Sequence, residues 1–400
     1  MKQEQKHYHN MKFNPEISES LTLKFAESVG LRKKRGEDVL SLGLGEPDFA
    51  TPQVLKDALV KVLDNPASSR YSAALGLMSL RQKIADDIKE RSHIPCEMKN
   101  IVITPGTKQA VMLSLMALLE PGDEVVIVLP AYVSYIPQIY IAEPEAVVKI
   151  VNLKKEDYSL DMDAIEKNVT SKTKVIIFNS PHNPTGMMVP EADQRRLFEI
   201  AEKNDCYIIS DEIYDRLVYG DVPHFSIGSL EESVSRVITV NGYGKSHAIT
   251  GWRLGYAIVP QQFMGKVTKL QQHINTNTST VLQMALDQAW PLPVDHLPGF
   301  CEKLKKRAEL FKEFLAAHPQ LKGSDPKGSF FVFLNISSTG LDSNTFSSQL
   351  VDKTGVATTP GIAFGKDWDD HIRLSLAVEE DVLKEAFNRI HNFIENKLWQ

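Results

Sequence analysis

Short apolar runs alternate with longer helical patterns through the middle of the chain, and this alternation restricts the fold more than any other feature. Residues 107–119 read as a helix that stops at Pro121-Gly122, and residues 191–203 read as another. Repeated strand–helix–strand units place parallel strands in one sheet, with helices on its faces. The runs predicted as buried strands are residues 125–129, 175–178, 207–210, 237–240 and 256–259. The sequence therefore predicts an α/β protein with a mainly parallel sheet.

The composition of the chain changes after Trp290, where prolines become frequent. A helix rich in Lys and Glu is predicted over 299–317, a strand over 329–335 and a last helix over 379–397. We predict two domains: a large domain over 46–289 and a smaller α+β domain built from 11–45 and 290–400, with 1–10 as a flexible N-terminus.

Composition excludes several classes of partner. The formal net charge of −6 over 400 residues offers no basic surface for nucleic acid. No apolar run is long enough to cross a membrane, and the polar start of the chain lacks the apolar core of a signal peptide. The three cysteines, Cys96, Cys206 and Cys301, match neither a disulfide framework nor a metal motif. We therefore expect a cytoplasmic protein without a metal site.

Four turns at predicted strand ends carry residues suited to chemistry. They span residues 103–108, 179–186, 210–214 and 241–245. In open parallel sheets, ligands bind outside the carboxyl ends of the strands, so the four turns are expected to face one crevice. Each turn alone is compatible with an ordinary helix start, a solvated charge pair or a surface lysine. Their order and spacing together indicate a functional site.

These segments resemble the signatures of the class I and II aminotransferases, which share the fold of aspartate aminotransferase (fold type I). The resemblance extends from about Leu42 to Ala377. It is carried by Gly45-Glu46-Pro47-Asp48-Phe49, Ser180-Pro181-His182-Asn183-Pro184-Thr185-Gly186, Asp211-Glu212-Ile213-Tyr214, Lys245 with Gly251-Trp252-Arg253-Leu254-Gly255, and His371-Ile372-Arg373-Leu374-Ser375. The resemblance implies an enzyme that uses pyridoxal 5'-phosphate, folded as a large domain with a mainly parallel sheet flanked by helices plus a smaller α+β domain.

The resemblance also implies roles for the catalytic and cofactor-binding residues. Lys245 would carry the cofactor as a Schiff base and then move the proton at the substrate Cα. Asp211 would keep the pyridine nitrogen protonated, which makes the ring a better electron sink. Asn183 and Tyr214 would hydrogen-bond the phenolic oxygen, and Tyr132 would stack on the ring.

The cofactor phosphate is expected at the start of the helix that opens with Gly106, Thr107 and Lys108. Free backbone N–H groups and the helix dipole favour an anion there, and Arg253 would add a guanidinium whose planar fork suits phosphate. Many relatives carry a phosphate-binding serine three residues before the lysine, whereas this chain has Gly242. Either Arg253, backbone amides and water replace that hydroxyl, or the local geometry differs.

The substrate is expected to bind through its carboxylate groups. By resemblance, Arg373 would hold the α-carboxylate in a bidentate contact, with Gly45 and Asn183 beside it. Lys108 matches a lysine that meets the distal carboxylate of the substrate in a bacterial-type subgroup of aspartate aminotransferases, which favours an acidic amino acid. A lysine exposed at a helix start is the alternative. Tyr71 resembles a tyrosine that reaches the phosphate from the other subunit of a homodimer.

Rival motifs fail at required positions. Gly244-Lys245-Ser246 ends like an ATP-binding P-loop, but the first glycine of that motif is replaced by Thr239. Gly43-Leu44-Gly45 begins like a dinucleotide fingerprint, but Asp48 holds the place of its third glycine. A transcription regulator built on this fold would need a DNA-binding domain, and only about forty residues precede Leu42.

We therefore predict a pyridoxal-phosphate-dependent aminotransferase of amino-acid metabolism. It would move an amino group from an L-amino acid to a 2-oxo acid by a ping-pong mechanism. The alternative is a lyase, synthase or oxidative enzyme of the same fold, because the same lysine, aspartate and arginine serve those reactions too.

Overall fold

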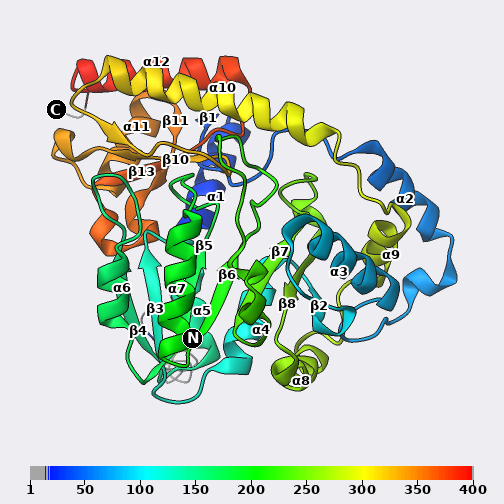
Figure 1. Cartoon of the computed structure of the whole chain (residues 1–400). Coiled ribbons are helices and arrows are strands. Elements are labelled where there is room, and N and C mark those ends of the chain that lie inside the picture. Colours follow the sequence, from blue (N-terminus) through cyan, green and yellow to red (C-terminus); the bar gives the residue numbers. More distant parts are fainter. Residues whose placement is uncertain (1–13, 15–16, 18, 399–400) are drawn as a thin grey trace, which may run out of the picture.

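A seven-stranded sheet forms the centre of the computed structural model, which describes residues 14, 17 and 19–398 (Figure 1). Its strands follow the order β2-β8-β7-β6-β5-β3-β4. They are β2 (Ile101–Thr104), β3 (Glu124–Leu129), β4 (Val147–Asn152), β5 (Thr173–Asn179), β6 (Tyr207–Asp211), β7 (Val237–Gly242) and β8 (Gly255–Ile258). All neighbours pair in parallel except at β8, which is antiparallel to both β2 and β7. The predicted α/β class and mainly parallel sheet are confirmed.

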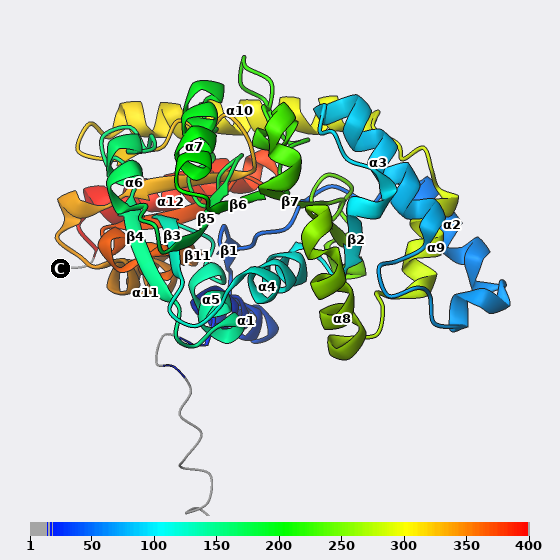
Figure 2. The same cartoon turned by 60° about the horizontal axis from the view of Figure 1, so that its bottom comes forward.

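Helices cover both faces of this sheet. Figure 2 shows α6 (Met162–Asn168) and α7 (Glu191–Lys203) on one side, and α4 (Thr107–Leu118) and α5 (Tyr135–Ala142) on the other. Every residue of β3 and β7 is buried. This explains why those strands are mostly apolar along their length rather than alternating between apolar and polar residues.

A second, four-stranded sheet lies above the first in Figure 1. Its antiparallel order is β12-β13-β10-β9, with strands β9 (Lys322–Gly323), β10 (Phe331–Asn335), β12 (Thr359–Pro360) and β13 (His371–Ser375). The helices packed with it are α10 (His296–Ala317), α11 (Ser343–Thr354) and α12 (Glu380–Glu395). Aromatic side chains fill this core, among them Phe311, Phe346 and Phe393.

The N-terminal segment joins the C-terminal part of the chain through a short parallel ladder. β1 (Leu40–Ser41) pairs with β11 (Val356–Ala357). The other helices are α1 (Leu21–Lys34), α2 (Gln53–Leu63), α3 (Met78–Ser92), α8 (Met264–Ile274) and α9 (Thr280–Gln288). The domain limits at 45/46 and 289/290 stay a prediction, and the proposed flexible segment 1–10 lies outside the described residues.

Several predicted element bounds were wrong by a few residues. The helix predicted from residue 299 begins at His296, so Pro298 lies inside its first turn. Proline is tolerated there because the first N–H groups of a helix have no intrahelical acceptor. The strand predicted from 329 begins at Phe331, after Ser329, whose φ is 57°. In the described part of the chain, no helix is both long and apolar enough to span a membrane.

Candidate active site

The predicted site residues follow three adjacent parallel strands. β5 ends at Asn179 and β6 ends at Asp211, and these two residues are paired in register. β7 ends at Gly242, three positions before Lys245. Because the carboxyl ends of β5, β6 and β7 meet at one edge of the sheet, the turns after them surround one site.

Lys245 is half-buried and its Nζ donates a hydrogen bond to the carbonyl oxygen of Gly45. Burial lowers the pKa of the Lys245 ammonium to about 8. The negative charge of Glu46 opposes this shift, and the positive charges of Arg373 and Arg253 add to it. A fraction of the amine is therefore neutral near neutral pH. Only the neutral amine can attack an aldehyde or accept a proton, so the site prepares Lys245 for both predicted roles.

Asp211 is buried at the end of β6 and accepts a hydrogen bond of 2.7 Å from the Tyr135 hydroxyl. Burial raises the pKa of the Asp211 carboxyl to about 6, although the bond from Tyr135 lowers it. A buried carboxylate with a raised pKa gains from an opposite charge beside it. A protonated pyridine nitrogen supplies such a charge.

Arg373, on β13, is 4% exposed and is held by three acceptors. Its Nη1 donates to Asn183 Oδ1 at 3.0 Å, and its Nη2 donates to Gly43 O at 2.9 Å and to Thr359 Oγ1 at 3.4 Å. The guanidinium carbon lies 4.1 Å from the centre of the Phe331 ring and 5.0 Å from that of Phe364.

The charge of Arg373 has no acidic partner within the described residues. The pKa of its guanidinium is lowered to about 10 by burial, against the raising effects of Tyr214 and Tyr132. Its Nε is buried without a hydrogen-bond partner. A buried cation of this kind is stabilised by an incoming carboxylate.

Asn183, Tyr214 and Tyr132 lie near these groups, and their contacts to the cofactor stay a prediction. Asn183 is positioned by its backbone N–H, which donates to Asn179 Oδ1 at 2.8 Å. Tyr214 is buried, which raises the pKa of its hydroxyl, while the nearby charge of Arg373 lowers it. The Tyr132 ring lies 5.5 Å from the Tyr135 ring, and the Lys108 ammonium lies 5.7 Å from the Tyr132 ring centre.

Three glycines bring the start of α4 against the sheet. Gly242 pairs with Gly255 across β7 and β8, and a Cβ on Gly255 would lie 2.6 Å from the backbone nitrogen of Thr107. Gly106 precedes the helix with φ +81°, and a Cβ there would lie 2.5 Å from Nη2 of Arg253. Free N–H groups of α4 and the Arg253 guanidinium therefore converge on one small space, which suits a phosphate group.

The close approach of Gly106, Gly242 and Gly255, called the glycine stack below, also bears on why this chain has glycine rather than serine at position 242. A Cβ on Gly242 would lie 3.0 Å from both Gly255 Cα and Leu254 O, which are backbone atoms. A serine side chain at this position would push against the backbone at the start of β8, so the close strand pairing seen here favours glycine. Arg253 and the backbone amides of α4 would then be the donors available to a phosphate group.

Two predicted residues, Tyr71 and Lys108, lie outside the buried cluster. Several residues that position the cluster were not predicted from the sequence. Tyr71 follows the 3₁₀ helix η2 (Pro66–Ser69) and is 86% exposed in the single chain. Lys108 is exposed on α4. The residues missed by the sequence are those that position others, namely Gly43, Tyr135, Phe331, Thr359 and Phe364. They carry no motif, because their roles depend on contacts between segments distant in sequence.

These residues fit pyridoxal phosphate. The glycine-lined start of α4 with Arg253 suits the phosphate, Asp211 suits the ring nitrogen, and the lowered pKa of Lys245 suits bonding to an aldehyde. The Oδ1 of Asn183 is occupied by Arg373, which leaves its amide N–H groups to donate to the phenolic oxygen.

Comparison with known proteins agrees with this geometry. The family model of aminotransferase class I and II matches residues 37–390. The chain is 36% identical to an aspartate aminotransferase of Pyrococcus abyssi, with 90% of this chain and 93% of that protein aligned. It is 33% identical to an aromatic-amino-acid aminotransferase of Thermococcus litoralis, with the same coverage of 90% and 93%.

Solved structures give the same result. The aspartate aminotransferase of Thermus thermophilus with maleate superposes with a TM-score of 0.88 at 31% identity, covering 94% of this chain and 96% of that one. The fold type I architecture is thus confirmed, and among the predicted reactions these relatives favour amino transfer over the lyase, synthase and oxidative alternatives. The chain belongs to the class I and II aminotransferase family and is a pyridoxal-phosphate-dependent aminotransferase.

Proposed function

We propose that this aminotransferase acts on an acidic L-amino acid of the aspartate or glutamate type, as a homodimer in the cytoplasm. The observation that carries the proposal is a pair of cations. Arg373 is a buried guanidinium without an acidic partner among the described residues, and Lys108 is a second, exposed cation beside Tyr132. Two cations in this arrangement suit a substrate with two carboxylates.

The residues of the site divide the reaction between them. When bound, pyridoxal phosphate supplies an electron sink for the charge that develops at the substrate Cα. Arg373 binds and orients the α-carboxylate. Lys245 Nζ takes the proton from Cα as a general base and later returns a proton as a general acid, which its pKa of about 8 permits near neutral pH. Asp211, oriented by Tyr135, stabilises the positive ring nitrogen.

Lys108 borders a cavity large enough for a substrate side chain. The cavity has a volume of about 720 Å³ and is lined by Lys108, Tyr132 and Phe364, among others. Phe364 also stacks against Arg373. The α-carboxylate site and the cavity therefore share a wall, and a substrate held by Arg373 can extend its side chain toward Lys108. The relative from T. thermophilus, solved with maleate, also holds a dicarboxylate.

An aromatic amino acid is the second candidate, because much of the same cavity is apolar. Leu129, Val133 and Ile136 contribute to its lining together with Tyr132 and Phe364. The relative from T. litoralis is named for aromatic substrates. Burying an aromatic ring against this apolar wall is favourable, whereas its aliphatic side chains have no hydrogen-bond donor for a carboxylate.

Substitution of Lys108 separates the two candidates. Lys108→Met keeps most of the length of the side chain but removes its charge. If the donor is acidic, kcat/KM for aspartate or glutamate falls roughly 10- to 100-fold, the effect of losing one charged hydrogen bond. The kcat/KM for phenylalanine serves as the internal control and should change little. An equal effect on both donors, or none on the acidic ones, contradicts the acidic assignment.

The homodimer is supported by exposed apolar side chains on one part of the chain. Val60 and Leu63 of α2 are 67% and 60% exposed, and Tyr71 and Met78 follow close behind them. Exposed apolar side chains such as these gain from being covered by a second subunit. A second subunit that covers it would also bury Tyr71, as its predicted role at the partner's phosphate requires. The cytoplasmic location rests on three cysteines that form no disulfide.

A further inference from the structure

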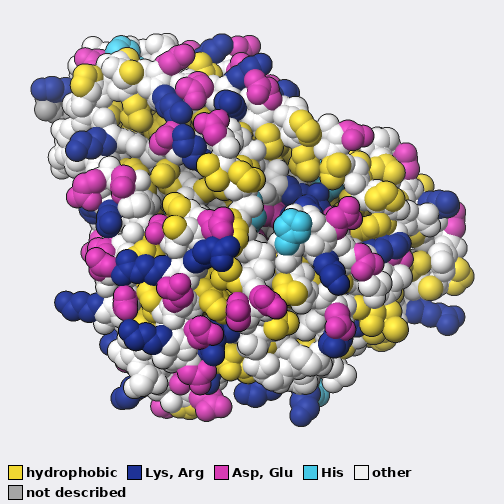
Figure 3. Space-filling view, viewed as in Figure 1, with side chains coloured by type: hydrophobic (Ala, Val, Ile, Leu, Met, Phe, Trp, Pro, Cys, Tyr) yellow, Lys and Arg dark blue, Asp and Glu magenta, His cyan; other side chains and the backbone are white. Residues whose placement is uncertain are grey.

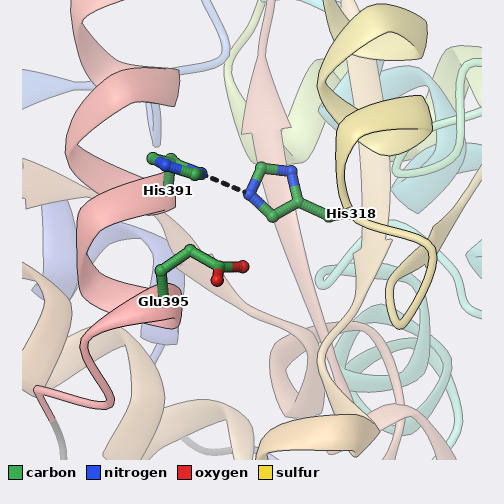
Figure 4. A group of neighbouring side chains, drawn as sticks. All are labelled: His318, His391 and Glu395. Carbon is green, nitrogen blue, oxygen red and sulfur yellow. Dashed lines mark hydrogen bonds between the residues drawn. The ribbon is translucent and has the colours of Figure 1, made fainter.

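Three side chains far from one another in sequence meet where α10 and α12 end. His318 follows the last residue of α10, and His391 and Glu395 lie on the last turns of α12 (Figure 4). Their possible ligand atoms all lie within 4.8 Å of one another. His391 and Glu395 are four positions apart, so they share one face of the helix. None of the three belongs to the active site described above.

Hydrogen-bond partners indicate the tautomers of the two histidine rings. His318 Nδ1 lies 2.7 Å from the carbonyl oxygen of Phe314, which can only accept, so Nδ1 carries a proton. In the neutral ring, Nε2 of His318 then holds a lone pair. It faces Nδ1 of His391 at 2.7 Å, so the proton between these two atoms belongs to His391.

The arrangement around His318 is that of a prepared metal ligand. A histidine that binds a metal ion usually donates its other ring N–H to a carbonyl or carboxylate, which fixes the tautomer and the ring orientation. The bond from His318 to Phe314 O does this, and His318 itself is only 2% exposed. His391 and Glu395 are exposed, so solvent can reach the group and complete a coordination sphere.

Electrostatics also favour a cation at this point. The C-terminal ends of α10 and α12 meet here, and each carries partial negative charge from its free carbonyl groups. Glu395 adds a full negative charge. Its Oε1 accepts a hydrogen bond of 3.4 Å from Gln320, a long contact that an ion would readily replace.

We propose that His318 Nε2, His391 Nδ1 and the Glu395 carboxylate bind a divalent transition-metal ion of the Zn²⁺ type, with water as the fourth ligand. Two imidazoles and one carboxylate are a ligand set that suits Zn²⁺. On binding, the proton on His391 Nδ1 moves to its Nε2, so both histidines stay neutral. The two nitrogens must separate to about 3.3 Å, the spacing set by tetrahedral Zn–N bonds of about 2.05 Å. The exposed ring of His391 can make that adjustment.

Such an ion would tie α10 to α12, two helices that pack against each other over the four-stranded sheet (Figure 1). The ion goes beyond amino transfer, since it would brace this part of the chain rather than take part in the reaction. The sequence predicted no metal site because His318 and His391 are 73 positions apart and form no compact motif.

The test is a Zn²⁺ titration of the cofactor-loaded enzyme by calorimetry, repeated with Co²⁺ to read the coordination from its visible spectrum. His7 and His9 could bind metal near the N-terminus, so every variant carries His7→Gln and His9→Gln. His318→Gln, His391→Gln and Glu395→Gln each remove one ligand. His273→Gln, at an exposed histidine of α8, is the matched control.

We expect one Zn²⁺ per chain in the background protein and in the His273→Gln control. Loss of either histidine of the pair should weaken binding by at least about tenfold, since even an outer-shell partner is worth 10- to 100-fold. Glu395→Gln, at an exposed residue, should weaken it without disturbing the fold. Four-coordinate Co²⁺ should give intense visible bands that disappear in His391→Gln. Absence of binding in the background protein, or equal affinity in all variants, would overturn the proposal.

Discussion

Arg373 Nη1 donates a 3.0 Å hydrogen bond to Asn183 Oδ1, joining the expected carboxylate site to a residue expected to touch the cofactor. The two residues come from β13 and from the turn after β5. If Arg373 holds the substrate carboxylate and Asn183 contacts the cofactor, this hydrogen bond couples the two binding events. A substitution of either residue should therefore alter both substrate binding and cofactor binding.

Arg373→Ala should act mainly on amino-acid binding. Loss of two charged hydrogen bonds should raise KM by about 100-fold or more, with a smaller fall in kcat. Thr359→Val is the matched control, because it keeps the guanidinium and removes only the Thr359 hydroxyl, with its 3.4 Å contact to Nη2 and its 3.2 Å bond to Gly43 O. Steady-state kinetics with varied amino acid check the prediction. An unchanged KM in Arg373→Ala would exclude the proposed carboxylate contact.

Asp211→Asn should stabilise the cofactor-free protein at neutral pH while abolishing turnover. The Asp211 carboxyl has a pKa of about 6 in the folded chain against an ordinary 3.8. Its contribution to stability is therefore complete below about pH 4 and is lost as the pH rises through 6. The loss amounts to at most about 3 kcal/mol, at about 1.4 kcal/mol per pKa unit.

Thermal unfolding of cofactor-free wild type and Asp211→Asn at several pH values measures this effect. The advantage of the variant should be larger at pH 7.5 than at pH 5. A difference in unfolding temperature that does not depend on pH would show that the carboxyl does not titrate as described.

Gly242→Ala should weaken cofactor binding by disturbing the glycine stack. The added Cβ would lie 3.0 Å from Gly255 Cα and Leu254 O, and backbone at such a distance must move, at a cost of about 1–3 kcal/mol. Gly244→Ala is a matched control one residue before Lys245, because a Cβ there would be 3.7 Å from its nearest neighbour. Gly242→Ala should have a higher cofactor dissociation constant and a lower unfolding temperature than Gly244→Ala. Equal behaviour would argue against the stack.

Mixing two inactive variants tests whether Tyr71 completes the site of a partner subunit. Tyr71→Ala and Lys245→Ala should each have little activity alone. After unfolding and refolding together, half of the dimers are mixed, and one of the two sites in each mixed dimer is intact. Activity should then recover to roughly a quarter of wild type. No recovery in a mixture shown to contain mixed dimers would contradict the shared site.

The sheet and the motif-bearing turns were predictable from sequence, since β5, β6 and β7 each contain a short, mostly apolar run followed by turn residues. The direction of β8 was not, because an apolar run of this kind looks the same in a parallel and an antiparallel neighbour. The start of α10 was also predicted wrongly, because Pro298 is typical of the end of a linker, although it lies in the first turn of the helix.

Within the site, the residues expected to contact cofactor or substrate could be identified from the sequence, but the residues that orient them could not. Asp211 and Arg373 lie in motifs. Tyr135, which orients Asp211 from 76 positions away, and Phe331, which stacks on Arg373, are ordinary aromatic residues in the sequence. Such contacts depend on how distant segments pack, which a single sequence does not display.

The most direct test of the account is a half-reaction followed by the visible spectrum. The purified, cofactor-loaded protein is mixed with single amino acids in the absence of any 2-oxo acid, and products are quantified. An acidic amino acid should convert the cofactor to its stable aminated form and release one equivalent of 2-oxo acid per site, and Lys245→Ala should do neither. A cofactor spectrum that persists while ammonia accumulates would contradict amino transfer as the reaction of this chain.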